Sequence, residues 1–252
     1  MLSIRALCNY RVVGEDGAIG SVAEFYFDDL HWEIRYLVVE TGHWYSSRQV
    51  LICPASVGPP DREEHRIPVF LTRKQIENWP DAETVKPVWR QMETELSRRF
   101  GWAYWGAAGY LIGGVMVPPP PRVLSESRPV QIEGPGANLR SSNEVIGYHI
   151  EARDGKIGHV EDFLLDDATW AIQFIVADTH NWLPSKKVLI VPQSVEKITW
   201  AERTVTVDLP RETIRNSPEF NSRLPRSESF ERLLHNYYDR QRLLAPILSK
   251  EH

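Results

Sequence analysis

Two pairs of adjacent carboxylates, Asp28–Asp29 and Asp166–Asp167, are the residues of this sequence best suited by type to chemistry. Neighbouring carboxylates can bind a cation or relay protons. Adjacent residues on a strand point to opposite faces, however, and Asp is common in turns. We therefore expect both pairs to serve turns, with a metal or proton-transfer role as the lesser alternative.

The remaining polar residues form no organised catalytic set. The histidines show no HExxH spacing, and the glycine patterns GxGxxG, GxxxxGK(S/T) and GxSxG are absent from the sequence. The two cysteines, Cys8 and Cys53, form no CxxC pair. We therefore predict no catalytic residue, no metal and no cofactor, and a protein that is not an enzyme. The eight histidines are at positions 31, 43, 65, 149, 159, 180, 235 and 252.

Length and charge limit the class of protein. The chain has 252 residues, which is enough for two domains of about 100 residues each. Its formal net charge of −5 gives no overall cationic field, so we expect no nucleic-acid partner. Few cysteines fit a reducing compartment, and the first residues lack the apolar core of a signal peptide. We expect a cytoplasmic protein without a transmembrane span, with peripheral attachment to a membrane as the alternative location.

The sequence contains an internal duplication. A shift of 138 positions aligns residues 10–80 with residues 148–218 without a gap, and 28 of these 71 positions are identical, so the two segments are copies of one unit. The repeated turn DGxIG is the clearest shared feature, because Asp favours turns and Gly accepts a positive φ. Duplication also predicts a pseudo-twofold pair of units that share an interface. We assign structural turn roles to Asp16, Gly17, Gly20, Asp154, Gly155 and Gly158.

Each copy is predicted to be rich in β-strands. Residues 11–29 combine a β-prone run, an Asp-Gly turn and a second apolar run, which predicts a hairpin with a bulge near Val22–Glu24. The helical turns that end each copy have Thr72 as an N-cap and Pro210 at an early helical position. Short strands at such spacing are typical of a small barrel or sandwich. The other predicted strands cover 34–40, 50–54 and 66–71, and their counterparts 172–178, 188–192 and 203–209.

The predicted fold class is mainly β, with two tandem small β-barrels, each followed by a short helical tail. Apolar residues at helical spacing mark the tails at 88–100 and 229–238. We expect each tail to pack on its own unit, with packing on the other copy or on a second chain as the alternative. The predicted domains are a first unit at 1–100, an apolar and Pro-rich linker at 101–142, and a second unit at 143–252.

The linker contains an uncharged, mainly apolar stretch, Trp102–Val117, followed by Pro118–Pro121. A membrane-spanning helix needs about 20 apolar residues, and the glycines of this stretch weaken a helix. A strand or loop packed on a barrel is therefore the favoured interpretation. An exposed docking segment and a membrane span are the alternatives. The prolines favour a stiff polyproline spacer.

These motifs resemble the PRC-barrel family. Both copies carry D-G-x-I-G-x-V, D-D-x-x-W, an apolar strand that ends in an acid and Thr, and W-x-x-x-(R/K)-x-V-L-I-x-P. The stretch GWAYWG at 101–106 is similar to the one that ends the first unit in tandem-barrel bacterial members. The resemblance covers most of residues 10–80 and 148–218, and it implies two PRC-barrels.

The resemblance implies docking more than catalysis. The barrel is similar to the cytoplasmic domain of the photosynthetic reaction centre H subunit, which supports electron and proton transfer to quinone. It is also similar to the C-terminal half of a ribosome maturation factor, which binds a ribosomal protein. We predict a non-enzymatic protein-docking or scaffold module. The alternatives are an accessory of photosynthetic or quinone-linked electron transfer, and a ribosome or RNA-processing accessory.

The expected partner is a protein. A membrane-bound complex is one candidate partner, and a homo-oligomer is a further possible form. Trp32 and Trp170 are predicted as anchors in the core or at the barrel rim, where aromatic residues also form binding hot spots. The candidate partner contacts are Trp44, Trp182, Trp102, Tyr104 and Trp105.

Overall fold

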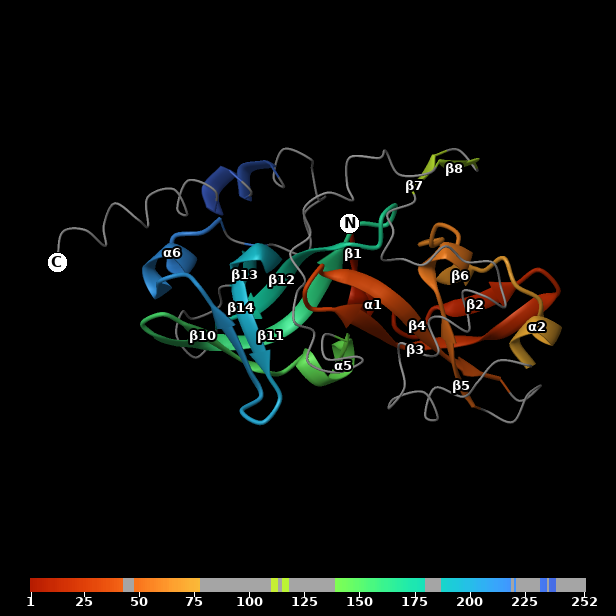
Figure 1. Ribbon diagram of the computed structural model, residues 1–252, viewed down its shortest axis with the longest axis horizontal. Helices are drawn as coiled ribbons and strands as arrows, with labels where there is room; N and C mark the ends of the chain where they lie inside the picture. The colour runs from red at the N-terminus through yellow and green to blue at the C-terminus, as the bar shows by residue number, and fades with distance from the viewer. Residues whose placement is uncertain are drawn as a thin grey trace.

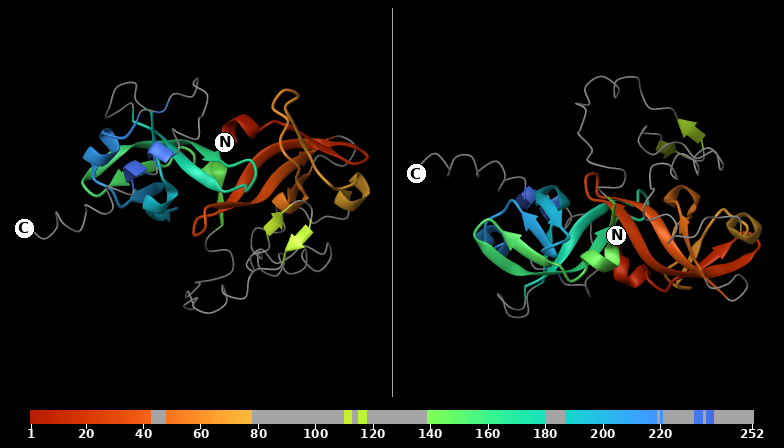
Figure 2. Two further views of the ribbon diagram at one scale, coloured as in Figure 1. Left: turned by 90° about the horizontal axis from the view of Figure 1, so that it is seen from above. Right: turned by 60° about the horizontal axis from the view of Figure 1, so that its bottom comes forward.

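The fold is mainly β and contains two large sheets that lie side by side along the long axis of the molecule (Figures 1 and 2). We call residues 10–77 the first repeat and residues 148–218 the second repeat. The segments that precede them, residues 1–9 and 139–147, are the first arm and the second arm. The computed structural model describes residues 1–42, 48–77, 110–112, 115–117, 139–179, 187–218, 220, 232–234 and 236–238.

The first repeat forms a sheet with the strand order β5-β4-β3-β2-β6. β2 and β3 form the predicted hairpin, and β3 has a bulge between Val22 and Glu24, where it was predicted. β6 joins β2 in parallel, whereas the other neighbours are antiparallel. The elements are β2 (Arg11–Gly14), β3 (Gly17–Asp28), β4 (Glu33–Thr41), β5 (Gln49–Ile52), η1 (Pro54–Ser56), β6 (Arg66–Pro68) and α2 (Arg73–Glu77).

The second repeat forms a sheet with the equivalent order, β13-β12-β11-β10-β15-β14. β15 joins β10 in parallel, as β6 joins β2. β14 is an additional strand that the sequence pattern did not predict. The elements are β10 (His149–Ala152), β11 (Gly155–Leu165), β12 (Ile172–Asp178), β13 (Lys187–Ile190), η3 (Pro192–Ser194), β14 (Val195–Thr199), β15 (Thr204–Val207) and α6 (Arg211–Arg215).

Strand pairing leaves both sheets open within the described residues. The first path ends at β5 and β6, and the second ends at β13 and β14. A short helix follows the last strand of each repeat. Thr72 caps α2 as predicted, because Gln75 donates its backbone N–H to the Thr72 hydroxyl at 3.3 Å and accepts the Thr72 N–H at 2.7 Å, which is a capping box. Pro210 is the N-cap of α6, one position before the helix.

The two arms are exchanged between the repeats. In the first arm, β1 (Leu2–Ser3) pairs antiparallel with β11 of the second repeat, and α1 (Ile4–Leu7) follows. In the second arm, β9 (Leu139–Ser141) pairs antiparallel with β3 of the first repeat, and α5 (Ser142–Val145) follows. Residue 1 accordingly lies at the boundary between the sheets (Figure 1). The last residues of the predicted linker, 139–142, therefore belong to elements that fasten the repeats together.

The larger of the hydrophobic clusters includes residues of both repeats. Phe27 and Phe163 meet across the boundary, with their ring centroids 5.2 Å apart. Trp32 and Trp170 are buried in the same core, and both have a φ of 59°. A bulky residue rarely adopts a positive φ. The surrounding core and backbone contacts must therefore stabilise this conformation in both copies.

The backbone contacts at the boundary are reciprocal. Ile34 donates its N–H to the carbonyl oxygen of Trp170 at 3.0 Å, and Ile172 donates to that of Trp32 at 2.7 Å. Residues 34 and 172, and likewise 32 and 170, are equivalent under the shift of 138. Such an exchange of equal contacts is the property of a twofold interface. The pseudo-twofold arrangement with a shared interface, predicted from the duplication, is therefore present.

Part of the apolar linker stretch is described, and it forms strands. Tyr110–Ile112 (β7) and Val115–Val117 (β8) make a two-stranded antiparallel sheet of their own, which confirms the strands but leaves the expected packing on a barrel a prediction. Among the described residues, no helix is both long and apolar enough to cross a membrane.

The second tail packs on its own repeat, as expected. Residues 232–234 and 236–238 are helical, and Leu234 and Tyr238 are buried. Tyr238 donates its hydroxyl to the carbonyl oxygen of Leu189 at 2.6 Å. The predicted first tail, 88–100, lies outside the described residues.

Candidate functional site at the boundary between the repeats

Each arm is fastened by a serine that bonds to a carboxylate of the opposite repeat. Ser3 caps α1 by accepting the N–H of Ala6 at 3.0 Å, and it donates its hydroxyl to Asp162 on β11. Ser141 likewise caps α5, and it donates its hydroxyl to Glu24 on β3. Positions 3 and 141 are equivalent, and so are positions 24 and 162. The two contacts are therefore one arrangement used twice.

Asp162 is buried within its contact. Besides the Ser3 hydroxyl, its carboxylate accepts the backbone N–H groups of Arg5 at 3.1 Å and Phe163 at 2.8 Å. Burial raises the pKa of this carboxyl above its ordinary value, although the hydrogen bonds oppose the rise. Burial and neighbouring carboxylates also raise the pKa of the Cys8 thiol to about 11. Cys8 is therefore protonated at neutral pH, and a protonated thiol is a poor nucleophile.

The first aspartate of each acidic pair serves its turn. Asp28 accepts the backbone N–H of Leu30 at 2.8 Å, and Asp166 accepts that of Thr169 at 2.7 Å. Arg35 also donates to Asp28 at 2.9 Å. Burial alone would raise the pKa of Asp28, but the hydrogen bonds from Arg35 and from the turn hold it below its ordinary value. These contacts confirm the predicted turn role for Asp28 and Asp166, whereas the second aspartate of each pair bonds to an arginine across the boundary.

The second aspartate of the first pair bonds to an arginine of the second arm. Asp29 Oδ2 lies 2.5 Å from Arg140 Nε, and the two side chains are only 12% and 17% exposed. Burial raises the pKa of Asp29, even though Arg140 opposes the rise. The Arg140 guanidinium also lies over the ring of Trp200, 5.7 Å from its centroid. This stacking connects the second arm to the turn between β14 and β15.

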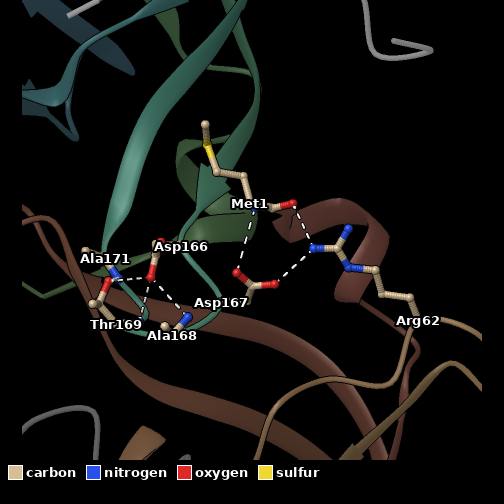
Figure 3. Close-up of polar contacts among 7 residues, drawn as sticks. All are labelled: Met1, Arg62, Asp166, Asp167, Ala168, Thr169 and Ala171. Atoms are coloured by element: carbon tan, nitrogen blue, oxygen red, sulfur yellow. Dashed lines mark hydrogen bonds and ion pairs between the residues drawn. The ribbon is translucent and has the colours of Figure 1, made fainter. Parts of the chain in front are cut away.

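The second aspartate of the other pair bonds to an arginine of the first repeat. Asp167 Oδ2 lies 2.9 Å from Arg62 Nη2, and the amino group of Met1 is 3.8 Å from Oδ1 (Figure 3). Burial would raise the pKa of Asp167, but backbone hydrogen bonding, the amino group and Arg62 lower it overall. Figure 3 also shows Asp166 directed into its turn, away from this ion pair.

The two ion pairs use arginines from non-equivalent positions. Under the shift of 138, Arg62 aligns with Trp200, and Leu2 aligns with Arg140. The first repeat and its arm therefore supply Arg62 to the opposite aspartate and have the apolar Leu2 in the arm. The second repeat and its arm supply Arg140 from the arm and have the apolar Trp200 in the repeat. The two aspartates stand at equivalent positions of the repeats, whereas the two arginines do not.

The carboxylates of this boundary hold turns or fasten one repeat to the other. Asp28, Asp29, Asp162 and Asp167 each accept bonds from an arginine, a hydroxyl or backbone N–H groups. In the described part of the chain, no group of three or more His, Cys, Asp or Glu residues is arranged to hold a metal ion. Chemically, two arginines neutralise Asp29 and Asp167 at the boundary, and a hydroxyl and backbone N–H groups solvate the buried Asp162.

The repeated DGxIG turn anchors a helix in both repeats. Asp16 accepts the N–H of Arg73, the first residue of α2, at 2.8 Å, and Asp154 accepts that of Arg211, the first residue of α6, at 2.7 Å. The glycines that follow the two aspartates have φ values of 133° and 134°, which other residues rarely adopt. The turn therefore ties the hairpin to the end of the same repeat.

The last glycine of the motif allows two strands to approach closely. A Cβ at Gly20 would overlap the carbonyl oxygen of Glu40 on β4. A Cβ at Gly158 would overlap the carbonyl oxygen of Asp178 on β12 in the same way. The close approach of the neighbouring strand therefore explains why glycine occurs at both positions.

Exposed apolar side chains mark other candidate contacts. Among the described residues, the large exposed hydrophobic side chains are Leu30, Phe70, Trp200 and Leu233. The two exposed aromatic side chains are not repeated, because Asp208 and Arg62 stand at the equivalent positions. The five predicted partner contacts, Trp44, Trp182, Trp102, Tyr104 and Trp105, lie outside the described residues.

Sequence reasoning missed the exchanged arms and the two arginines that cross the boundary. The one signal in the arms is the serine shared by positions 3 and 141. The signal for the ion pairs is that an arginine in one copy aligns with an apolar residue in the other, at positions 2 and 140 and at positions 62 and 200. Neither the comparison with protein-family models nor the comparison with curated proteins gives a match.

Proposed function

We propose that this chain is a non-enzymatic docking or scaffold protein, built from two small β domains of the PRC-barrel type. The observation that best supports this function is an exposed tryptophan held in place beside an arginine. Trp200 is 53% exposed, and Arg140 lies over its ring. Trp and Arg are among the residues most enriched in binding hot spots. Leu30, 51% exposed, follows Asp29 in the same turn, and we call Leu30, Arg140 and Trp200 the docking surface.

The docking surface has a preorganised base. Arg140 belongs to β9, which is paired with β3, and its guanidinium is held by Asp29. A side chain that is already fixed loses little conformational entropy when a partner binds. Arg140 and Trp200 can therefore contribute to affinity with a small ordering cost.

The docking surface is present on one side of the boundary. On the opposite side, Arg62 stands where Trp200 would be, and Leu2, at the position of Arg140, is buried in the core. A nearly symmetric body with one such surface is suited to bind one partner per chain.

Affinity capture with matched variants tests this proposal. Trp200→Arg and Phe70→Asp each introduce the residue found at the equivalent position of the other repeat, so both changes suit an exposed site. The tagged protein is exposed to native lysate, with soluble and membrane fractions kept apart, and captured proteins are quantified by mass spectrometry. We expect a stoichiometric partner with the wild type and with Phe70→Asp, and at least a tenfold loss with Trp200→Arg.

The fraction that contains the partner separates the candidate roles. A membrane-complex partner favours an accessory of photosynthetic or quinone-linked electron transfer. A ribosomal partner favours the ribosome accessory, and another soluble partner favours a plain docking module. No partner for the wild type, or equal capture by Trp200→Arg, would contradict docking through this surface.

A further inference from the structure

The boundary between the repeats lies on an approximate twofold axis. Glu33 and Ala171 occupy equivalent positions, and they face each other in an isolated antiparallel bridge. A residue that meets its own equivalent lies at such an axis, and the patch on each side of the axis is then nearly the same. The boundary face of each repeat is therefore complementary to a domain that closely resembles the repeat itself.

The ion pairs are compatible with a pair of identical repeats. Each repeat presents one aspartate, Asp29 or Asp167, and receives an arginine from the opposite side. The second repeat supplies Arg140 through its arm, with Trp200 beside it, whereas the first supplies Arg62. In a pair of two second repeats, each side would contain Asp167, Arg140 and Trp200. Each Asp167 would then face an Arg140 of the opposite copy.

The arm contacts favour the second repeat as its own partner. Phe25 donates its N–H to the Ser142 hydroxyl of the second arm at 3.1 Å, whereas the equivalent residue of the first arm is Ile4, whose side chain cannot accept a hydrogen bond. A pair of two first repeats would leave this N–H unsatisfied, at a cost in free energy. In the second repeat, the N–H of Phe163 bonds to the adjacent Asp162 and does not depend on the arm.

We propose that the second repeat with its arm binds a second copy of itself, so that two chains can join through their second repeats. Within one chain, the segment 78–138 keeps the first repeat at a high effective concentration. The intramolecular pair therefore prevails in the isolated chain. The pair between chains forms when the first repeat is released. This proposal stands independently of the partner of the docking surface.

Cutting the linker in the full-length protein tests the proposal. A protease site is inserted between Pro121 and Arg122, and the intact, folded protein is cleaved. Cleaved protein labelled with ¹⁵N is mixed with unlabelled cleaved protein, and native mass spectrometry resolves all pairs. We expect labelled and unlabelled halves to mix, and a pair of two C-terminal halves to appear alongside the mixed pair. The pair of two N-terminal halves should be at least tenfold less abundant than the C-terminal pair.

Two matched variants identify the interface responsible. Arg140→Leu introduces the residue of position 2 and removes both cations from the C-terminal pair, so we expect at least a tenfold loss of this pair. Arg62→Trp introduces the residue of position 200 and touches only pairs that contain the N-terminal half, so the C-terminal pair should persist. Absence of the C-terminal pair, with or without mixing of the halves, would overturn the proposal. An unchanged amount of it in Arg140→Leu would also do so.

Discussion

Ser3 donates its hydroxyl to the carboxylate of Asp162, 159 residues further along the chain. The same serine caps α1, so one side chain both starts the helix of the first arm and fastens it to the second repeat. Because Asp162 is buried, the serine replaces hydrogen bonds that the carboxylate would otherwise make with water. Local helix formation and association of the repeats are therefore coupled through a single residue.

We expect Ser3→Ala to lower the free energy of unfolding by about 1–2 kcal/mol, because it removes an N-cap and a bond to a buried carboxylate. Ser141→Ala is the matched variant. It should cost less, because Glu24 is only partly buried and can turn to water. Urea denaturation followed by tryptophan fluorescence measures both. Equal stability of Ser3→Ala and wild type would contradict this coupling.

Asp162 should make stability fall as pH rises. Its pKa is raised in the folded protein, so its contribution is complete below the unfolded value of about 3.9 and is lost as pH rises through the folded value. Asp162→Asn does not titrate, so its free energy of unfolding should rise relative to wild type as pH increases from about 4. Denaturation curves across this range give the difference.

Asp167→Asn is the control for the pH series, because the pKa of Asp167 is lowered by folding. The contribution of Asp167 is present above about pH 3.9 and is lost as pH falls through the folded value. The deficit of Asp167→Asn should therefore be largest at neutral pH and vanish in acid. If the stability difference from wild type changed with pH in the same direction for both variants, the two carboxyls would not have the opposite pKa shifts described above.

The core of each repeat was predictable because its signals are local. The alternation of apolar residues, the Asp-Gly turn and the bulge near Val22 depend on neighbours in sequence, and duplication presents each signal twice. The helix cap at Thr72 followed from residue type alone. Closure of a sheet into a barrel is not set by such local signals, because it depends on how strands far apart in the sequence meet.

The exchanged arms were not predictable from the same signals. Residues 1–9 and 139–147 share only the serine of positions 3 and 141, and each arm is too short to show a period. Their strands form only against the opposite repeat, so the decisive contacts join residues far apart in sequence. A comparison of equivalent positions in the two copies does not reveal the arginines, because Arg62 and Arg140 are not at equivalent positions.

Arg140 and Arg62 should differ in their contributions to stability. Arg140→Leu leaves Asp29 mostly enclosed without its cation, and we expect a loss of about 3 kcal/mol. Arg62→Leu leaves Asp167 in a solvated position, and we expect a loss of about 1 kcal/mol or less. The Arg140→Leu deficit should shrink in acid as Asp29 becomes protonated. Equal losses measured by urea denaturation at neutral pH would contradict the difference in enclosure.

Substitution of the glycines in the repeated turn should lower the free energy of unfolding for two separable reasons. One is the closeness of the neighbouring strand, and the other is the backbone conformation. Gly20→Ala places a Cβ against the Glu40 carbonyl, so β3 and β4 must move apart, and we expect a loss of about 3 kcal/mol or more. Gly147 provides the control, because it has a φ of 98° but a Cβ added there would meet no atom within 4 Å. Gly147→Ala should cost about 1–2 kcal/mol from conformation alone.

Gly147→Asn tests the conformational part further, since Asn9 occupies the equivalent position with a φ of 72° and Asn tolerates this region. It should be more stable than Gly147→Ala, whereas Gly20→Asn should be no better than Gly20→Ala, because a wider choice of φ does not remove an overlap with backbone. Thermal and urea unfolding of the four variants would separate the two causes. If Asn rescued both positions equally, the close approach of β3 to β4 would not be the reason that glycine occurs at position 20.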